Sequence, residues 1–180
     1  MRNQNQFFLT VIGIAIILLP ASSYADGWFS SGKSGVAPVT NKLYETECSA
    51  CHFAYQPGLL PERSWIKMFN NLGDHFGEDA SMSKENTQAL LQYATSNAAD
   101  KSSHKRSVKI NRSIKSNDTP LRVSETKYIM QKHHELSRRH LEDNPKVKTL
   151  ARCEACHTRI NEGSFSEREI KIPGFGRWED

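Results

Sequence analysis

The sequence lacks a hydrophobic run long enough to cross a lipid bilayer. A membrane-spanning helix needs about 20 consecutive apolar residues, whereas the longest run, Phe7 to Leu19, has thirteen. This run follows the positively charged Arg2 and precedes Ser23-Tyr24-Ala25, which has the small-x-small form of a signal-peptidase site. The pattern predicts a secretory signal over residues 1–25, a soluble mature chain and a periplasmic location. An uncleaved N-terminal anchor is the alternative interpretation.

The sequence also lacks a strong excess of charge of one sign. Without residues 1–25, 23 Lys and Arg face 20 Asp and Glu, which is a net charge of +3. This balance does not favour nucleic acid as a partner. No combination of a nucleophile and a general base is recognisable in the sequence either, so an enzyme is not predicted.

Apolar residues are too few for a large core, because they make up only 37% of the chain. The mature part has about 155 residues, enough for one or two small domains. A covalently held and buried prosthetic group would supply apolar surface that this chain does not have.

Cysteine is scarce, but the four cysteines form two copies of the same motif, Cys-x-x-Cys-His. They lie in Cys48-Ser49-Ala50-Cys51-His52 and in Cys153-Glu154-Ala155-Cys156-His157. Cys-x-x-Cys-His is the attachment motif of c-type haem: two thiols bond to one porphyrin, and the adjacent imidazole becomes an axial ligand of its iron. The motifs therefore predict two covalently attached haem c groups, with Cys48, Cys51, Cys153 and Cys156 as attachment residues and His52 and His157 as proximal ligands.

Two other sites use four cysteines. An exported chain can form two disulfides, but disulfides would not require a histidine directly after each pair. A four-cysteine zinc site usually has its half-sites close in sequence, whereas 101 residues separate Cys51 from Cys153. Both interpretations are weaker than haem attachment.

The sixth coordination position of each iron determines reactivity. An open position binds small gases or peroxide, and a second protein ligand favours electron transfer. The mature chain offers eight further candidates, which are His75, His104, His133, His134, His140, Met68, Met82 and Met130.

Three helices are predicted in the first half of the mature chain. One begins after Thr40 as N-cap and ends near His52, and another covers residues 84–96 after Ser83 as N-cap. Between them, Pro61 begins a helix that Gly73 ends, with one apolar face formed by Trp65, Met68, Phe69 and Leu72. Met68 is thus expected in the core. His75 follows the glycine directly, and Met82 is its main competitor for the first iron.

The middle of the chain is basic. Between Asp100 and Lys115, six basic residues accompany one acid. We expect residues 100–118 to be a solvated linker or surface helix between an N-terminal haem-binding half, 26–99, and a C-terminal half, 119–180. A hinge or docking surface is the alternative, and His104 is expected to be exposed.

A further helix is predicted from Thr126 to about Arg139. Ile129, His133, Leu136 and His140 would share one stripe of it, while His134 would point about 100° away. His133 is therefore the preferred ligand and His140 the reserve, and Met130 is a weak candidate. Asn144 and Pro145 are expected to begin a last helix that leads into Cys153 with Val147, Leu150 and Ala151 on its inner side.

The chain resembles the dihaem cytochrome c family of small bacterial periplasmic electron carriers. The likeness covers most of the mature chain, and is carried by both Cys-x-x-Cys-His motifs, Pro57-Gly58-Leu59-Leu60-Pro61, Ser64-Trp65, Leu72 to Ala80, Thr119-Pro120-Leu121-Arg122, His133-His134-Glu135-Leu136 and Ile172-Pro173. It implies bis-histidine ligation, with His75 and His133 as distal ligands. It also implies electron transfer from a membrane donor to a soluble haem protein.

We therefore expect a mainly α-helical, cytochrome c-like protein with two low-spin haems that carries electrons. Proximity in sequence pairs His52 with His75 and His157 with His133, and crossed pairing stays open. Where the family has one histidine before the glutamate, this chain has two, and the helix face selects His133. The alternative functions are an electron-entry dihaem subunit of a periplasmic reductase of the nitrate reductase type, a dihaem peroxidase and a gas-binding haem protein.

Overall fold

The computed structural model describes residue 33 and residues 35–178. All of them belong to the second of two units, Ser31–Asp180. The predicted secretory signal lies outside the described residues. Within the described part of the chain, no helix has the length and hydropathy needed to span a bilayer.

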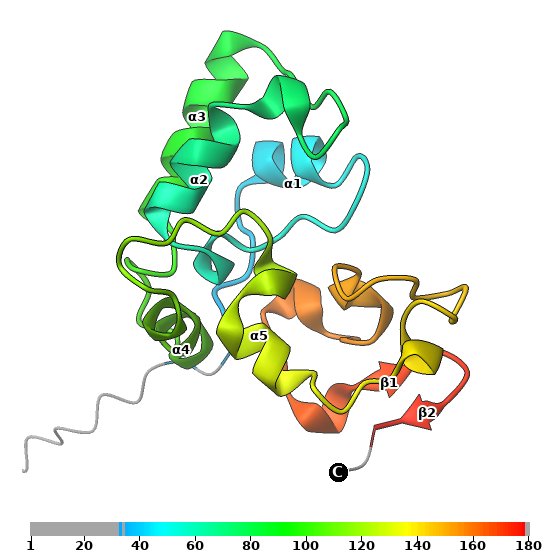
Figure 1. Ribbon diagram of the computed structural model, residues 1–180. Coiled ribbons are helices and arrows are strands. Elements are labelled where there is room, and N and C mark those ends of the chain that lie inside the picture. Colours follow the sequence, from blue (N-terminus) through cyan, green and yellow to red (C-terminus); the bar gives the residue numbers. More distant parts are fainter. Residues whose placement is uncertain (1–32, 34, 179–180) are drawn as a thin grey trace, which may run out of the picture. The chain divides into compact units, whose positions relative to one another are not determined.

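The described unit is mainly helical, as predicted (Figure 1). Its α-helices are α1 (Lys42–Cys48), α2 (Glu62–Phe69), α3 (Lys84–Ser96), α4 (Lys105–Ser113) and α5 (Lys127–Lys132). Short 3-10 helices cover Pro57–Leu59, Leu72–Asp74, Val123–Glu125, Arg138–His140, Cys153–Ala155, Ile160–Glu162 and Glu167–Glu169. Near the C-terminus, β1 (Lys171–Ile172) pairs antiparallel with β2 (Gly176–Arg177).

All three helices predicted in the first half are present, but α1 and α2 are shorter than predicted, since α2 ends at Phe69 and a separate 3-10 turn contains Gly73. Ser83 caps α3 through its hydroxyl, which accepts the Asn86 N–H, and α3 spans the predicted residues. In α1 the cap is Asn41 rather than Thr40, because the Asn41 side chain accepts the Tyr44 N–H at 2.9 Å. Helix α1 ends at Cys48, so only the first cysteine of its motif is helical.

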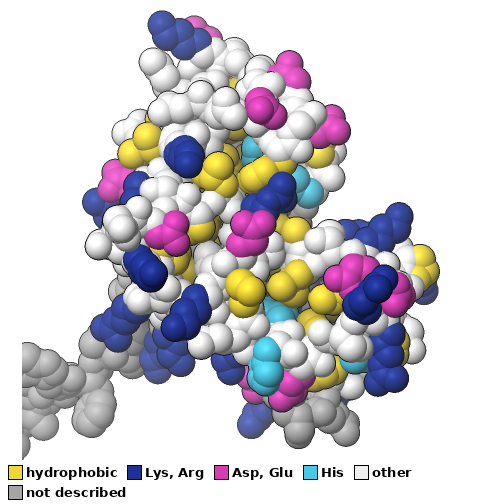
Figure 2. All heavy atoms as spheres, viewed as in Figure 1, with side chains coloured by type: hydrophobic (Ala, Val, Ile, Leu, Met, Phe, Trp, Pro, Cys, Tyr) yellow, Lys and Arg dark blue, Asp and Glu magenta, His cyan; other side chains and the backbone are white. Residues whose placement is uncertain are grey.

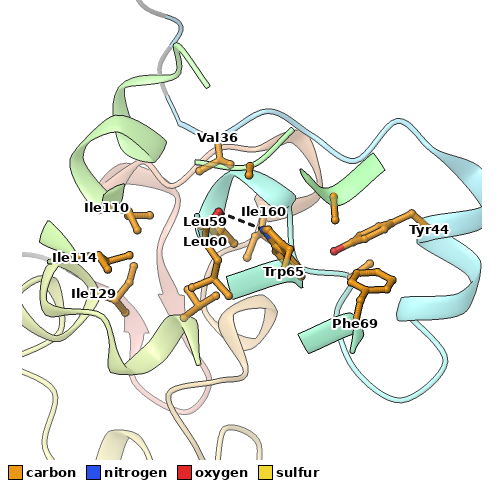
Figure 3. Close-up of a cluster of buried hydrophobic side chains, with 14 of the residues drawn as sticks. Val36, Tyr44, Leu59, Leu60, Trp65, Phe69, Ile110, Ile114, Ile129 and Ile160 are labelled. Atoms are coloured by element: carbon orange, nitrogen blue, oxygen red, sulfur yellow. Dashed lines mark hydrogen bonds between the residues drawn. The ribbon is translucent and has the colours of Figure 1, made fainter. Parts of the chain in front are cut away.

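A single cluster of buried side chains joins the two ends of the described unit (Figure 3). It contains Val36, Tyr44, Leu59, Leu60, Trp65 and Phe69 from the N-terminal side and Ile110, Ile114, Ile129 and Ile160 from the rest. The Trp65 indole donates to the Pro57 carbonyl at 2.8 Å, so its polar atom is satisfied inside the cluster. Both haem motifs are therefore held on the same core.

The basic segment forms a helix, α4, with one face in this core. Ser107 and Ile110 are fully buried, while Lys105 and Lys109 face solvent. The helix packs against α5 and against the 3-10 turn Pro57–Leu59. The segment was expected to be a linker or a surface helix. The structure has a helix, and one face of this helix forms part of the core.

The helix predicted from Thr126 to about Arg139 is much shorter, because α5 ends at Lys132. In a continuing helix the Ile129 carbonyl would accept the backbone N–H of His133. Here that carbonyl accepts the Nδ1–H of the His133 ring at 2.7 Å, and the His133 N–H bonds to the Met130 carbonyl instead. The histidine side chain thus ends the helix, and the prediction for residues 133–139 was wrong.

The helix predicted to lead into Cys153 is also absent from the described chain, where residues 144–152 form turns. The Asn144 side chain accepts the Lys146 N–H at 3.1 Å, a turn conformation that competes with helix formation. Lys148 has a φ of 66°, which an α-helix does not accommodate. Val147 is nevertheless buried, as expected for the inner side.

Gly58 sets how closely α4 approaches the N-terminal segments. A Cβ atom on Gly58 would lie 2.6 Å from Ser107 Oγ and 2.9 Å from a Val36 methyl carbon. We expect Gly58→Ala to lower the free energy of unfolding by about 1–3 kcal/mol, because an overpacked core must shift. Denaturant unfolding of the haem-loaded protein measures this.

Gly73→Ala is the matched control for that substitution. A Cβ atom on Gly73 would lie 3.6 Å from Ser81 Oγ, which is an ordinary contact. An equal loss of stability in the two variants would contradict the role given to the close approach at Gly58.

Candidate haem sites

The first motif lies at the end of α1. Cys48 closes the helix and is partly buried, whereas Cys51 and His52 lie on the exposed turn that follows. The His52 Nδ1–H donates to the Phe53 carbonyl at 2.7 Å, which leaves Nε2 as the nitrogen with a free lone pair.

His75 faces His52 from a tight loop after Leu72–Asp74. The loop closes through paired backbone bonds between His75 and Glu78, at 2.7 and 3.3 Å, and turns through the left-handed Phe76 and Gly77. The His52 and His75 ring centroids are 6.1 Å apart, and the ring planes are inclined by 23°. The structure thus brings together two histidines that are separated by 22 residues in sequence.

The second motif is held by the C-terminal segment. It forms a 3-10 turn over Cys153–Ala155, and the Cys156 carbonyl accepts the Lys171 N–H at 2.9 Å. His157 and Ile170 form an isolated antiparallel bridge beside it. The small sheet therefore supports the backbone of the second proximal histidine.

His133 faces His157 from the end of α5. Their ring centroids are 6.0 Å apart, with planes inclined by 76°. The bond from His133 Nδ1 to the Ile129 carbonyl orients the ring and leaves its Nε2 free. The hydrogen bond that ends α5 therefore also positions this imidazole.

Burial favours the neutral form of His157, His133 and His75. It lowers the pKa of His157 to about 4, with further contributions from His133 and Arg106. The pKa of His133 and of His75 is lowered for the same main reason. A neutral imidazole offers the lone pair that a metal ion requires.

No disulfide joins any of the four cysteines, so all four are available for thioether bonds. Burial is the main cause that raises the pKa of the Cys48 and Cys153 thiols to about 11. These surroundings do not favour the thiolate form that catalytic or redox-sensing cysteines use. The two motifs also lie in separate places, each with its own histidine pair.

The competing histidines have other partners or other positions. His140 is buried, but its Nδ1 accepts the Ser137 N–H, and its ring packs on Phe175 and Trp178. His134 is exposed and lies 3.8 Å from Glu135. His104, which was expected to be exposed, is partly buried as the N-cap of α4, with its side chain near Ser102.

The methionines also lie elsewhere. Met68 and Met82 are partly buried and pack against the hydrophobic cluster, and Met130 is 57% exposed. Met68 therefore has the core position expected from its helix face. The side chain with a metal-binding atom whose ring faces that of His52 is His75.

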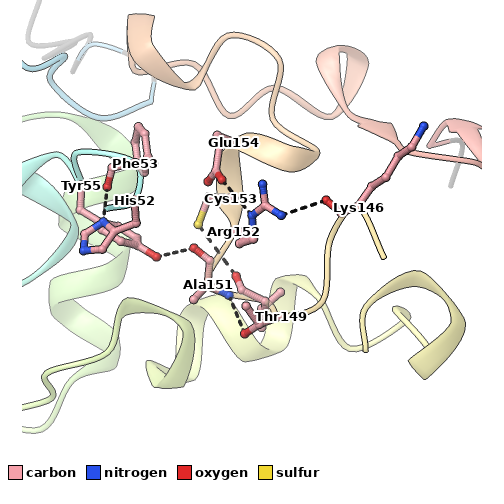
Figure 4. Close-up of polar contacts among 10 residues, drawn as sticks. His52, Phe53, Tyr55, Lys146, Thr149, Ala151, Arg152, Cys153 and Glu154 are labelled. Atoms are coloured by element: carbon pink, nitrogen blue, oxygen red, sulfur yellow. Dashed lines mark hydrogen bonds and ion pairs between the residues drawn. The ribbon is translucent and has the colours of Figure 1, made fainter. Parts of the chain in front are cut away.

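Tyr55 connects the two sites (Figure 4). Its ring contacts His52 edge-on, with centroids 5.4 Å apart, and its hydroxyl donates to the Ala151 carbonyl two residues before Cys153. Burial, followed by the nearby Cys153, raises the pKa of Tyr55, so the hydroxyl stays protonated and can donate. The sequence analysis missed this residue, because a tyrosine three positions after a haem motif has no distinctive spacing.

The residues at both sites fit a bis-histidine haem. Two imidazoles that bind one metal ion from opposite sides, each about 2 Å from it through a ring nitrogen, have centroids roughly 6 Å apart. The observed separations are 6.1 and 6.0 Å, and each pair stands beside its own pair of cysteines. The Phe53 carbonyl binds Nδ1–H of His52 and leaves its Nε2 for this chemistry, and a backbone bridge to Ile170 holds the main chain of His157.

Comparison with known proteins agrees with this geometry. The family model of dihaem cytochrome c matches residues 44–165. The diheme cytochrome type c from Shewanella baltica OS155 is 34% identical, with a TM-score of 0.65 over 77% of this chain and 98% of that chain. The diheme cytochrome c from Rhodobacter sphaeroides is 41% identical, with a TM-score of 0.64 over 72% of this chain and 100% of that chain.

A second structure of the Rhodobacter sphaeroides protein gives a TM-score of 0.58 at 40% identity, over 71% of this chain and 99% of that chain. A search of curated proteins gave no significant match. The family model covers more than half of the chain, and the solved structures are covered nearly completely by it. The chain therefore belongs to the dihaem cytochrome c family and carries two covalently attached haem c groups.

Proposed function

We propose that the protein is an electron carrier in which both haem irons have two histidine ligands. The observation that carries this proposal is the pair of facing imidazoles at each motif, 6.1 and 6.0 Å apart. His52 and His75 would hold the first iron, and His157 and His133 the second. Cys48, Cys51, Cys153 and Cys156 would form the thioether bonds.

Two protein ligands on each iron favour electron transfer over catalysis. Each haem c supplies one iron that changes its charge by a single electron. A peroxidase or a gas sensor needs an open position on at least one iron. In this proposal His75 and His133 fill the sixth positions, and the support is that their rings face those of His52 and His157. We therefore propose a carrier and not an enzyme.

Tyr55 supports exchange between the two haems within one chain. Its ring lies beside the proximal histidine of the first site, and its hydroxyl bonds to the loop that carries the second motif. A short connection of packed and hydrogen-bonded atoms would let an electron enter at one haem and leave from the other.

We further propose that the protein works in the periplasm. The support is the sequence of residues 1–25, in which a positively charged residue, an apolar run and a small-x-small site follow one another as in a secretory signal. Partners would be a membrane donor and a soluble haem-protein acceptor. Positive and negative side chains are interspersed on the face seen in Figure 2, which suits brief encounters with more than one redox partner.

Replacement of His75 or His133 by alanine tests the ligand assignment. Each substitution should convert one haem, and only one, from low-spin to high-spin, because the iron loses one imidazole. Optical and EPR spectra of the oxidised protein measure the change, and a haemochrome assay should still find two haems per chain, since the cysteines remain.

His134→Ala and Met82→Leu are the matched controls for this experiment. His134 is adjacent to His133 but exposed, and Met82 is the alternative ligand for the first iron. Both controls should leave two low-spin haems. A high-spin signal in either control, or unchanged spectra after His75→Ala or His133→Ala, would contradict the assignment.

Tyr55→Phe tests the connection between the haems. The variant keeps the ring beside His52 but loses the bond to Ala151, so we expect slower electron exchange between the two haems. We also expect a loss of about 1–3 kcal/mol in the free energy of unfolding, because the carbonyl loses its donor. Pulse radiolysis gives the exchange rate, and denaturant unfolding gives the stability.

Tyr93→Phe is the control for that variant, because the Tyr93 hydroxyl also takes part in a hydrogen bond, to the Thr40 N–H, on the side of the N-terminal helices. It should leave the exchange rate unchanged. Equal rates in wild type and Tyr55→Phe would show that Tyr55 has no part in the exchange.

A further inference from the structure

Arg106 is a cation from the basic segment whose side chain faces the second haem site. It lies in the first turn of α4 and lines the same pocket as His133, His157, Cys153 and Cys156. The other basic residues nearby, such as Lys105 and Lys109, are exposed. Arg106 therefore differs from the charges that surround it.

The guanidinium is held by hydrogen bonds and ring contacts with two residues, Tyr128 and Phe165. Its Nη1 donates to the Tyr128 hydroxyl at 3.1 Å and its Nη2 to the Phe165 carbonyl at 2.9 Å. It also lies over the Tyr128 and Phe165 rings, 5.8 and 5.4 Å from their centroids. The Phe165 ring in turn contacts the His157 ring, with centroids 5.2 Å apart. Only one aromatic ring thus separates the charge from the second proximal histidine.

No counter-ion for Arg106 is found among the described residues. No carboxylate of the described chain lies within 4 Å of the guanidinium, and the buried Nε–H has no hydrogen-bond acceptor. A buried donor that carries charge is costly unless it meets an acceptor, above all an anion. The haem that this pocket would hold carries two propionate anions.

We infer that Arg106 donates through Nε to a propionate of the second haem and raises the reduction potential of that haem. The inference rests on the proposed function, since it assumes the haem held by His157 and His133. A positive charge beside the iron stabilises the reduced form, which carries one positive charge fewer than the oxidised form.

Among the described residues, the cation in the corresponding place at the first site is Arg122, which also acts on its distal histidine, His75. Arg122 lies over the Phe76 ring at 3.9 Å, next to His75, but it is about half exposed and pairs with Glu125 at 3.5 Å. Water and a carboxylate therefore screen it. The effect of Arg106 should be confined to one of the two haems.

Redox titration of the full haem-loaded chain, followed optically, tests this inference. Arg106→Gln and Arg106→Met, which both remove the charge, should lower the equilibrium constant for reduction of one haem by roughly tenfold or more, or about 59 mV for one electron. The other transition should stay in place. The titration of His75→Ala, in which only the second haem is expected to stay low-spin, assigns the shifted transition.

Two further variants separate the proposed contact from other effects. Arg106→Lys keeps the charge and should stay within about threefold of the wild-type constant, and Lys109→Gln removes an exposed charge from the same helix and should change neither transition. A tenfold drop in Arg106→Lys, or a shift in Lys109→Gln equal to that in Arg106→Gln, would overturn the inference. Where Arg106→Met does not fold, Arg106→Gln keeps a polar side chain and carries the test.

Failure of this inference and failure of the proposed function give different results. Unchanged potentials in Arg106→Gln and Arg106→Met, with both haems low-spin, would overturn the role of Arg106 and leave the carrier intact. A high-spin second haem in the wild type would instead overturn the proposed function.

Discussion

The two facing imidazoles at each motif are the constraint on which the rest of the structure depends. A bis-histidine iron fixes the centroids of its ligands roughly 6 Å apart, and both pairs have that separation, 6.1 and 6.0 Å. Each motif provides only one imidazole of its pair. The loop around His75 and the end of α5 at His133 place the other imidazole opposite it, and the hydrogen bonds at these two places hold the rings in position.

The same hydrogen bonds serve the fold and the sites. The bond from His133 to the Ile129 carbonyl both ends α5 and orients the ring, and the bond from Lys171 to the Cys156 carbonyl joins the sheet to the second motif. Tyr55 and Arg106 act in a similar way over longer distances, since each connects a haem site to a segment far away in sequence through a hydrogen bond. The chain has few apolar residues to form a core, and Cys48 of the first site and Cys153 of the second pack against the same hydrophobic cluster.

The sequence was most informative where structure depends on neighbouring residues, as in helix capping. It was least informative where a hydrogen bond of one side chain changes the backbone conformation. Ser83 predicted α3 correctly because capping is local. The stripe through Ile129, His133 and His140 predicted a long helix. Hydrophobic periodicity does not show that the His133 ring will donate to the Ile129 carbonyl and so end the helix. His133 was still selected, and the structure places it by His157, although the helix used to select it stops there. Arg106 was counted only as one charge of a basic segment, since its burial depends on Tyr128 and Phe165 from elsewhere in the chain.

The central claim is that both irons are closed by two histidines, and an EPR spectrum of the oxidised haem-loaded protein tests it most directly. We predict two low-spin ferric signals of equal intensity and of different anisotropy, because the imidazole planes are inclined by 23° at the first site and by 76° at the second. A high-spin signal of one haem per chain would contradict the account.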